Sequence, residues 1–128
     1  MRVGEAQTAS IDSREPWNHT GIRLTAGEQY GMHASGTWVD WFIPHGPDGG
    51  PSDSFYLHLL ESRRRRPHDN WFALIGALDE NLNTAFTIGS QCTFTAPGDG
   101  ELTCFANDLE HFYFNNHGAV TLTVTRIA

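Results

Sequence analysis

The sequence predicts an all-β protein, an antiparallel β-sandwich of jelly-roll type, and three observations lead to this prediction. Several short segments alternate apolar and polar residues with period 2, which is typical of strands with one face in a core and one in water. The 13 glycines and 6 prolines supply many turns, and helical periodicity is weak throughout. We therefore expect about eight to ten short strands. The 128 residues show no repeat or linker and fit one domain spanning residues 1–128.

The first predicted strands form a hairpin. Residues 20–25 alternate, residues 26–28 supply a turn, and residues 30–38 alternate again, so we expect the two segments to pair. Residues 71–78 then form a nearly continuous apolar run. Periodicity alone does not distinguish a helix from a strand there. The short length and the surrounding β pattern favour a central strand buried on both faces.

A second hairpin is predicted near the C-terminal end. Residues 91–95 and 101–105 flank a Pro-Gly-Asp-Gly turn, which would place Cys92 and Cys104 nearly opposite each other on adjacent strands. Two buried free thiols in a reducing compartment are favoured, because free Cys is among the most buried residue types; a cross-strand disulfide is the alternative. Residues 118–127 alternate small or apolar residues with Thr and Arg and predict a final strand.

Three long segments lack strand character, namely residues 43–54, 61–70 and 106–117. Long irregular loops in a compact domain usually carry function. The second of them includes four consecutive arginines, Arg63, Arg64, Arg65 and Arg66. We expect this run to be a solvated loop, with binding of anionic glycans or of an acidic neighbouring subunit as the alternative.

The charge balance excludes some classes of partner. The chain has 15 acidic and 8 basic side chains, a formal charge of -7, and all its basic residues are arginines. Nucleic-acid binders usually show a basic face, so we expect no nucleic-acid partner. No apolar run approaches the roughly 18 residues that span a bilayer, and the first ten residues lack a basic-then-apolar export signal. We expect a soluble protein without membrane insertion, either cytoplasmic or released without a cleaved signal.

The third loop is rich in oxygen donors. Asp108 supplies a carboxylate, and Asn115 and Asn116 supply carboxamides. Calcium takes about six to eight oxygen ligands from such groups, from backbone carbonyls and from water. Asn and Asp are also common turn residues, since they tolerate left-handed backbone and cap their own chain. A calcium loop and a plain turn are therefore both possible from these residues.

The spacing in this loop resembles that of a known family. The loop begins with Asn107-Asp108, continues for six residues to Asn115-Asn116, and reaches Gly118 and an alternating terminal strand after one more residue. This pattern resembles the calcium loop of the PA-IL-like galactophilic lectins, which are bacterial calcium-dependent galactose-binding proteins. Further weak similarities fall in the expected order at residues 34–38, 68–69 and 96–97. The resemblance implies a galactose-binding-domain-like sandwich, a carbohydrate partner of galactose type, bound Ca²⁺ and a homo-oligomer.

The resemblance also assigns roles to individual residues. Asp108, Asn115 and Asn116 would be side-chain ligands of the calcium ion, Phe112 would contribute a backbone carbonyl, and either Trp41 or Asp40 would contribute another. In such lectins two adjacent sugar hydroxyls complete the calcium shell. The implied sugar contacts are Asp108, Asn115, Asn116, Trp41, Leu109 and Phe112. His45 and His68 are further candidates for lining the sugar site.

Aromatic rings near the ion could cover the apolar face of the sugar. Trp41, Tyr113 and Phe112 are the candidates, and core packing is the alternative for each of them. We expect Trp41 to be exposed, because it follows Asp40 and opens the longest loop. The family also places a His and a Gln in the first loop, where this sequence has no matching Gln and has His45 at an earlier position.

Other functions find less support in the sequence. A glycosidase needs two carboxylates facing each other across a cleft, and no second acid is marked as the partner of Asp108 or Glu110. There is no Gly-x-Ser-x-Gly motif and no glycine-rich phosphate loop, so we expect no catalytic residues and no enzyme. The main alternative to a lectin is a structural or interaction domain of a larger assembly, in which the Asn-Asn loop is only a turn.

Overall fold

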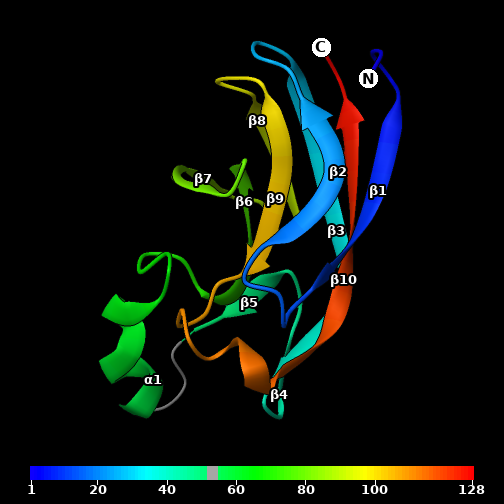
Figure 1. Cartoon of the computed structure of the whole chain (residues 1–128). Coiled ribbons are helices and arrows are strands. Elements are labelled where there is room, and N and C mark those ends of the chain that lie inside the picture. Colours follow the sequence, from blue (N-terminus) through cyan, green and yellow to red (C-terminus); the bar gives the residue numbers. More distant parts are fainter. Residues whose placement is uncertain (52–54) are drawn as a thin grey trace.

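Two antiparallel sheets face each other in the computed structural model, which describes residues 1–51 and 55–128 (Figure 1). This architecture confirms the predicted β-sandwich. The first sheet has the order β1 (Ala6–Asp12), β10 (Asn116–Arg126), β3 (Gln29–Asp40) and β4 (Ile43–His45), and β8 (Gln91–Thr95) also pairs with β3. The second has the order β2 (Asn18–Leu24), β9 (Gly100–Ala106), β6 (Trp71–Leu78) and β5 (Asp48–Gly50), and β7 (Asn81–Thr87) also pairs with β6.

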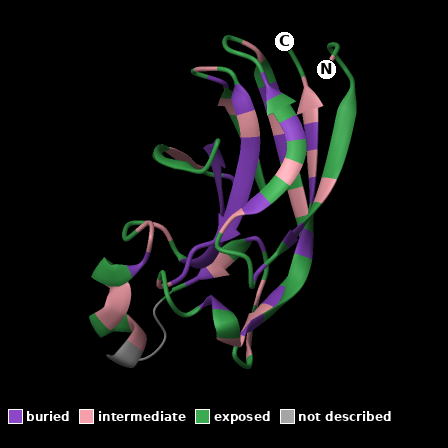
Figure 2. Ribbon diagram, viewed as in Figure 1, coloured by how far each residue is buried: buried purple, intermediate pink, exposed green. Residues whose placement is uncertain are grey.

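The core lies between the two sheets. Every residue of β6 is buried, as predicted for a central strand covered on both faces, and Figure 2 shows β6 and β9 buried along most of their length. The rings of Trp38 in β3 and Phe72 in β6 meet edge to face, with centroids 5.9 Å apart. The indole Nε1 of Trp38 donates a hydrogen bond to the carbonyl of Phe72 at 3.1 Å. Each large apolar side chain buried in this way contributes about 1.5–3 kcal/mol to the free energy of unfolding. The two sheets therefore hold the ends of the loops in fixed positions.

The two predicted hairpins are wrong. β2 pairs with β9 rather than with β3, and β8 pairs with β3 rather than with β9. The turns at residues 25–28 and 96–99 therefore carry the chain from one sheet to the other. The two turns also bind each other, because the backbone N–H of Gly27 donates to the carbonyl of Ala96 at 2.9 Å and that of Ala26 donates to Oδ1 of Asp99 at 2.8 Å. Two strands joined by a turn show the same alternation of apolar and polar residues whether they pair with each other or belong to different sheets. Which of the two arrangements forms depends on strands distant in sequence.

The cysteines do not face each other on adjacent strands, because β8 and β9 belong to different sheets. Both are free thiols; Cys92 is half-buried and Cys104 is buried. Burial raises the pKa of Cys92 to about 11 and raises that of Cys104 further. The preference for free thiols over a disulfide is confirmed, and both thiols are protonated core groups at neutral pH.

Several elements were not predicted. β1 and β7 carry few large apolar residues and gain their structure by pairing with β10 and β6. The first predicted loop contains the short strands β4 and β5, while its residues 52–54 lie outside the described residues. A short helix, α1 (Phe55–Leu60), continues into a 3-10 turn, η1 (Glu61–Arg63), and a second 3-10 turn is η2 (Tyr113–Asn115). No helix in the described part of the chain has the length and apolar character needed to cross a bilayer.

Candidate functional site

The oxygen-rich loop lies at the end of the sandwich that is farthest from the two termini, beside α1 and β4 (Figure 1). The pairing of β3 with β10 assembles part of this site, because Asp40 at the end of β3 lies opposite Asn116 at the start of β10. The backbone N–H of Trp41 donates to the carbonyl of Asn115 at 3.0 Å. Residues about 75 positions apart in the sequence are therefore neighbours through backbone hydrogen bonds alone.

Asp108 is a buried carboxylate in this site, with 4% of its surface exposed. Nδ2 of Asn116 donates to Oδ2 of Asp108 at 3.0 Å, and the backbone N–H of Leu109 donates to Oδ1 at 2.7 Å. Burial raises the pKa of Asp108 to about 6 despite these two hydrogen bonds, and the negative charge of Asp40 adds to the effect. A carboxylate buried in this way is stabilised by any cation that binds beside it.

Two side-chain amide oxygens of the same loop are also buried. Oδ1 of Asn115 and Oδ1 of Asn116 are buried without a hydrogen-bond donor in the described part of the chain. The orientation of the Asn116 amide is defined, because its Nδ2 donates to the carbonyl of Ser13 at 3.0 Å as well as to Asp108. A buried acceptor left unpaired costs about 1–3 kcal/mol. One carboxylate and two orphaned carboxamide oxygens are a donor set that suits a hard cation such as Ca²⁺.

The other predicted metal ligands lie nearby. Phe112 precedes η2 and is half exposed, and both Asp40 and Trp41 adjoin Asn115 and Asn116 through the β3–β10 pairing. Burial raises the pKa of the Asp40 carboxyl. Among the described residues no group of three or more His, Cys, Asp or Glu side chains is arranged to hold a metal ion. A cation at Asp108 would therefore depend on carboxamide and carbonyl oxygens.

A cleft of about 430 Å³ opens beside these oxygens. Six of its lining residues belong to the set predicted from sequence for the metal or the sugar. The full lining consists of Asp40, Trp41, Phe42, Ile43, Leu57, Leu60, Trp71, Asp108, Leu109, Phe112 and Asn115. Trp41 is 66% exposed, which confirms the prediction that its ring lies at the surface.

Three residues proposed from the sequence lie elsewhere. The ring of His45 packs on that of Phe72 with centroids 5.3 Å apart, and His68 is exposed; neither lines the cleft. Tyr113 is a core residue, because it is buried and its hydroxyl donates to the carbonyl of Ala106 at 2.7 Å. The structure thus leaves Trp41 and Phe112 as the rings from the predicted set that border the cleft.

Sequence reasoning missed five apolar residues of the cleft lining, Phe42, Ile43, Leu57, Leu60 and Trp71. Leu57 and Leu60 lie on α1, three positions apart and therefore on one face of the helix. That spacing is the sequence feature that could have indicated an apolar helix face. A helix of six residues is too short to give a recognisable periodic pattern. Trp71 was predicted only as part of a buried strand. Phe42 belongs to the tight turn between β3 and β4, and Ile43 is the first residue of β4.

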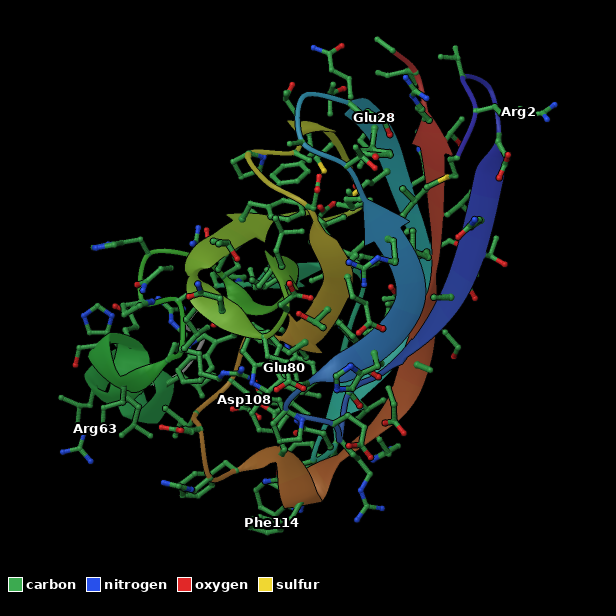
Figure 3. All side chains as sticks on the ribbon, turned by 45° about the horizontal axis from the view of Figure 1, so that its top comes forward. Arg2, Glu28, Arg63, Glu80, Asp108 and Phe114 are labelled. Carbon is green, nitrogen blue, oxygen red and sulfur yellow. The ribbon has the colours of Figure 1, made fainter. Side chains whose placement is uncertain are left out.

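The arginine run is not the solvated loop that was predicted. Arg63 is exposed and points away from the molecule in Figure 3, but Arg64 is buried and its guanidinium lies 5.0 Å from the centroid of the Trp71 ring. The guanidinium of Arg65 lies 3.6 Å from the centroid of the Phe105 ring and donates to Oη of Tyr113 at 2.8 Å. Flat guanidinium groups stack well on aromatic rings, which is why these arginines pack inward.

The backbone of the same run holds the oxygen-rich loop. Arg64 forms a β-bridge with Leu109, and the N–H of Arg65 donates to the carbonyl of Asp108 at 3.1 Å. The fully buried Asn107 fixes the neighbouring turn. Its Oδ1 accepts from the N–H of Arg66, and its Nδ2 donates to the carbonyls of Arg66, Asp69 and Asn70 at 2.9, 3.2 and 3.0 Å. Asn107 is therefore a structural residue that positions Asp108.

Comparisons with known proteins bear on the fold. No protein-family model matches the chain, and no curated protein matches it in sequence. The chain is similar to the solved structure described as "EclA N-terminal domain; PllA-like lectin", with a TM-score of 0.68 and 22% sequence identity over 93% of this chain and 94% of that one. It is also similar to "IMPa metallopeptidase in complex with T-antigen", with a TM-score of 0.52 and 12% identity, over 97% of this chain but only 12% of that one. The fold is thus a β-sandwich of the kind found in a lectin domain.

Proposed function

We propose that this domain binds carbohydrate through a calcium ion held by Asp108, Asn115 and Asn116, with galactose-type glycans as its ligands. The observation that carries the proposal is the pair of buried, unpartnered amide oxygens beside a buried carboxylate. Two further observations support it. The spacing of the loop resembles that of calcium-dependent galactophilic lectins, and the fold is similar to a lectin domain.

The residues of the chain have separate roles in this proposal. A bound calcium ion would supply open coordination positions for two adjacent sugar hydroxyls. Asp108, Asn115 and Asn116 offer the oxygens that hold the ion, and Ser13 orients the Asn116 amide. The exposed ring of Trp41 at the border of the cleft offers a face for the apolar side of a sugar ring.

The proposal is tested most directly at one of the orphaned oxygens. Asn115→Leu keeps the size of the side chain and removes the unpaired acceptor. We expect calorimetric titration to show calcium binding, and calcium-dependent binding of methyl galactoside, for the unchanged protein and neither for this variant. The matched control is Asn83→Leu, an exposed position on β7 away from the site. If Asn115→Leu binds calcium and methyl galactoside as the unchanged protein does, the proposed site is wrong.

A second candidate function is supported by exposed aromatic residues. Trp41, Phe42, Phe112 and Phe114 are 66%, 68%, 48% and 68% exposed, and such a concentration of apolar side chains is typical of an interaction surface. Under this alternative the domain is a structural or interaction module that binds another protein without metal. Homo-oligomerisation fits either function, since several copies of a weak sugar site gain avidity together. Light scattering of the purified protein measures the oligomeric state.

The absence of enzymatic activity is also a prediction. Incubation with nitrophenyl galactosides in the presence of calcium should release no nitrophenol. Calcium-dependent release that is lost in Asn115→Leu would contradict this prediction and place the protein among the hydrolases.

A further inference from the structure

His19 lies between two glutamates at the surface of the second sheet. It belongs to β2, where it pairs with Thr103 of β9. Its ring atom Nε2 lies 2.6 Å from Oε1 of Glu80, and Nδ1 lies 3.0 Å from Oε1 of Glu101. Glu80 belongs to the turn between β6 and β7, and Glu101 belongs to β9. A single imidazole therefore joins two strands and a turn.

The two contacts define the protonation state of His19. A neutral imidazole has one N–H and one acceptor nitrogen, whereas an imidazolium donates from both nitrogens. Ionised carboxylates only accept hydrogen bonds. Both ring nitrogens can therefore bind glutamates at the same time only when each of them carries a proton and His19 is positively charged.

Charged groups lie around His19 on each neighbouring element, namely Arg23 on β2, Asp79 and Glu80 in the turn, and Glu101 on β9. The hydrogen bond to Glu101 raises the pKa of His19 above its ordinary value of 6.5, and the charges of both glutamates add to the effect. In return, the hydrogen bond from His19 lowers the pKa of Glu101 from its ordinary value of 4.5. The contacts stabilise the fold fully between pH 4.5 and 6.5. This stabilisation is lost as the pH rises through the raised pKa of His19, or falls through the lowered pKa of Glu101.

The turn that contains Glu80 has an unfavourable backbone. Asp79 and Glu80 have φ angles of 49° and 59°, in the left-handed region that favours Gly and Asn. Their N–H groups donate to the carbonyl of Glu101 at 2.9 Å and to Oγ1 of Thr103 at 3.0 Å. Contacts with β9 and with His19 therefore hold the turn in a conformation that its own residues disfavour.

The same turn forms one wall of a second cleft, which has a volume of about 390 Å³. The wall on this side consists of Leu78, Asp79, Asn81 and Thr84, and the opposite wall consists of Pro97, Gly98 and Asp99. A change in the position of the turn therefore changes the shape of this cleft.

We propose that His19 is a pH-sensitive clamp on the β6–β7 turn. With both ring nitrogens protonated it joins β2 and β9 to the turn, and loss of one proton releases a glutamate and loosens this wall of the second cleft. The side chain of His19 is 61% exposed, so its proton exchanges directly with the surrounding water. Neither calcium nor a sugar takes part in the clamp.

Nuclear magnetic resonance of the full chain tests the protonation of His19. The chemical shifts of its ring nitrogens follow the titration, and we expect a pKa above 6.5. In Glu101→Gln this pKa should fall toward the ordinary value, whereas Glu5→Gln should leave it unchanged. Glu5 is the matched control, because it is an exposed carboxylate that accepts the N–H of Arg2 and lies next to the other sheet. A pKa of 6.5 or below in the unchanged protein, or the same pKa in Glu101→Gln, would overturn the inference.

Amide hydrogen exchange tests whether this proton controls the turn. Between pH 5.5 and pH 8.5 we expect the protection factor of the Glu80 amide to fall about two- to five-fold, as the loss of one exposed ion pair allows. The amide of Ala34, which donates to Ser90 in the other sheet, should not follow. His19→Gln should abolish the pH dependence at Glu80, and His33→Gln, which removes an exposed histidine of β3, should keep it. A fall that persists in His19→Gln, or an equal fall at Ala34, would overturn the inference, because another group or the whole fold would then be responsible.

Discussion

Replacement of Asp108 by Asn should change the stability of the domain in opposite directions with and without calcium. In the folded protein burial raises the pKa of Asp108 from 3.8 to about 6. Between these two pKa values the folded state binds more protons than the unfolded state, so stability falls as the pH rises. At pH 7 the ionised carboxylate therefore lowers the free energy of unfolding by about 3 kcal/mol in the metal-free protein.

The Asp108→Asn substitution would remove this penalty at a small cost. An amide can accept only one of the two hydrogen bonds that Leu109 and Asn116 donate to Asp108, and loss of the other costs about 1 kcal/mol. We expect metal-free Asp108→Asn to be about 2 kcal/mol more stable than the unchanged protein at pH 7, which raises Tm by about 6–10 °C. At pH 4 the advantage should disappear.

In calcium the unchanged protein should be more stable than Asp108→Asn. An ion present at about a thousand times its Kd stabilises the unchanged protein by about 4 kcal/mol, whereas Asp108→Asn has lost its charged ligand and gains nothing. Thermal unfolding in chelator and in calcium, at pH 4 and pH 7, measures all these differences. Asp99→Asn is the control, since Asp99 is an exposed carboxylate that also accepts a backbone N–H but lies away from the site. The reasoning is refuted if metal-free Asp108→Asn is less stable than the unchanged protein at pH 7, or if calcium leaves the order unchanged.

Three further substitutions test the framework of the site by denaturant unfolding. Asn107→Ala removes four hydrogen bonds from a fully buried group. It should lower the free energy of unfolding by about 4 kcal/mol and weaken calcium binding. A decrease below about 1 kcal/mol would contradict the structural role of Asn107. Arg65→Lys keeps the charge but not the flat stacking surface and should cost about 1–2 kcal/mol, whereas Arg63→Lys should cost nothing measurable; equal effects would argue against the stacking. Gly49→Ala introduces a Cβ that would lie 2.1 Å from the carbonyl oxygen of Trp71, at a φ of +67°, and should cost more than about 2 kcal/mol, whereas Gly98→Ala, which meets no atom within 4 Å, should be tolerated.

Local chemistry was sufficient to predict much of the fold and to single out one loop rich in oxygen donors. Alternation in β10 and the apolar run of β6 predicted strands because a strand presents alternate faces and a doubly covered strand buries both. Asp108, Asn115 and Asn116 were singled out because one loop holds all three oxygen donors and because their spacing resembles that of a known calcium loop. The structure joins Asn116 to Asp108 by a hydrogen bond and places Asp108 and Asn115 in the lining of one cleft.

The part of the cleft that α1 contributes could not be predicted in this way. Leu57 and Leu60 come from a helix that is too short to produce a periodic pattern, and they reach the cleft because Arg64 bridges to Leu109. The inward packing of Arg64 and Arg65 depends on rings supplied by Trp71 and Phe105, which come from other strands. A run of charged residues looks like a solvated loop when such partners are unknown.

The sequence by itself determined the β class, the doubly buried central strand and the location of a loop rich in oxygen donors, because each depends on residue types within one short segment. Only the tertiary structure decided that the turns at residues 25–28 and 96–99 cross between sheets and that Asp40 lies opposite Asn116. It also decided that two amide oxygens are left without donors among the described residues. The physical reason is the same in each case. Pairing, burial and the absence of a hydrogen-bond partner are relations between distant segments, and they exist only once the chain has folded.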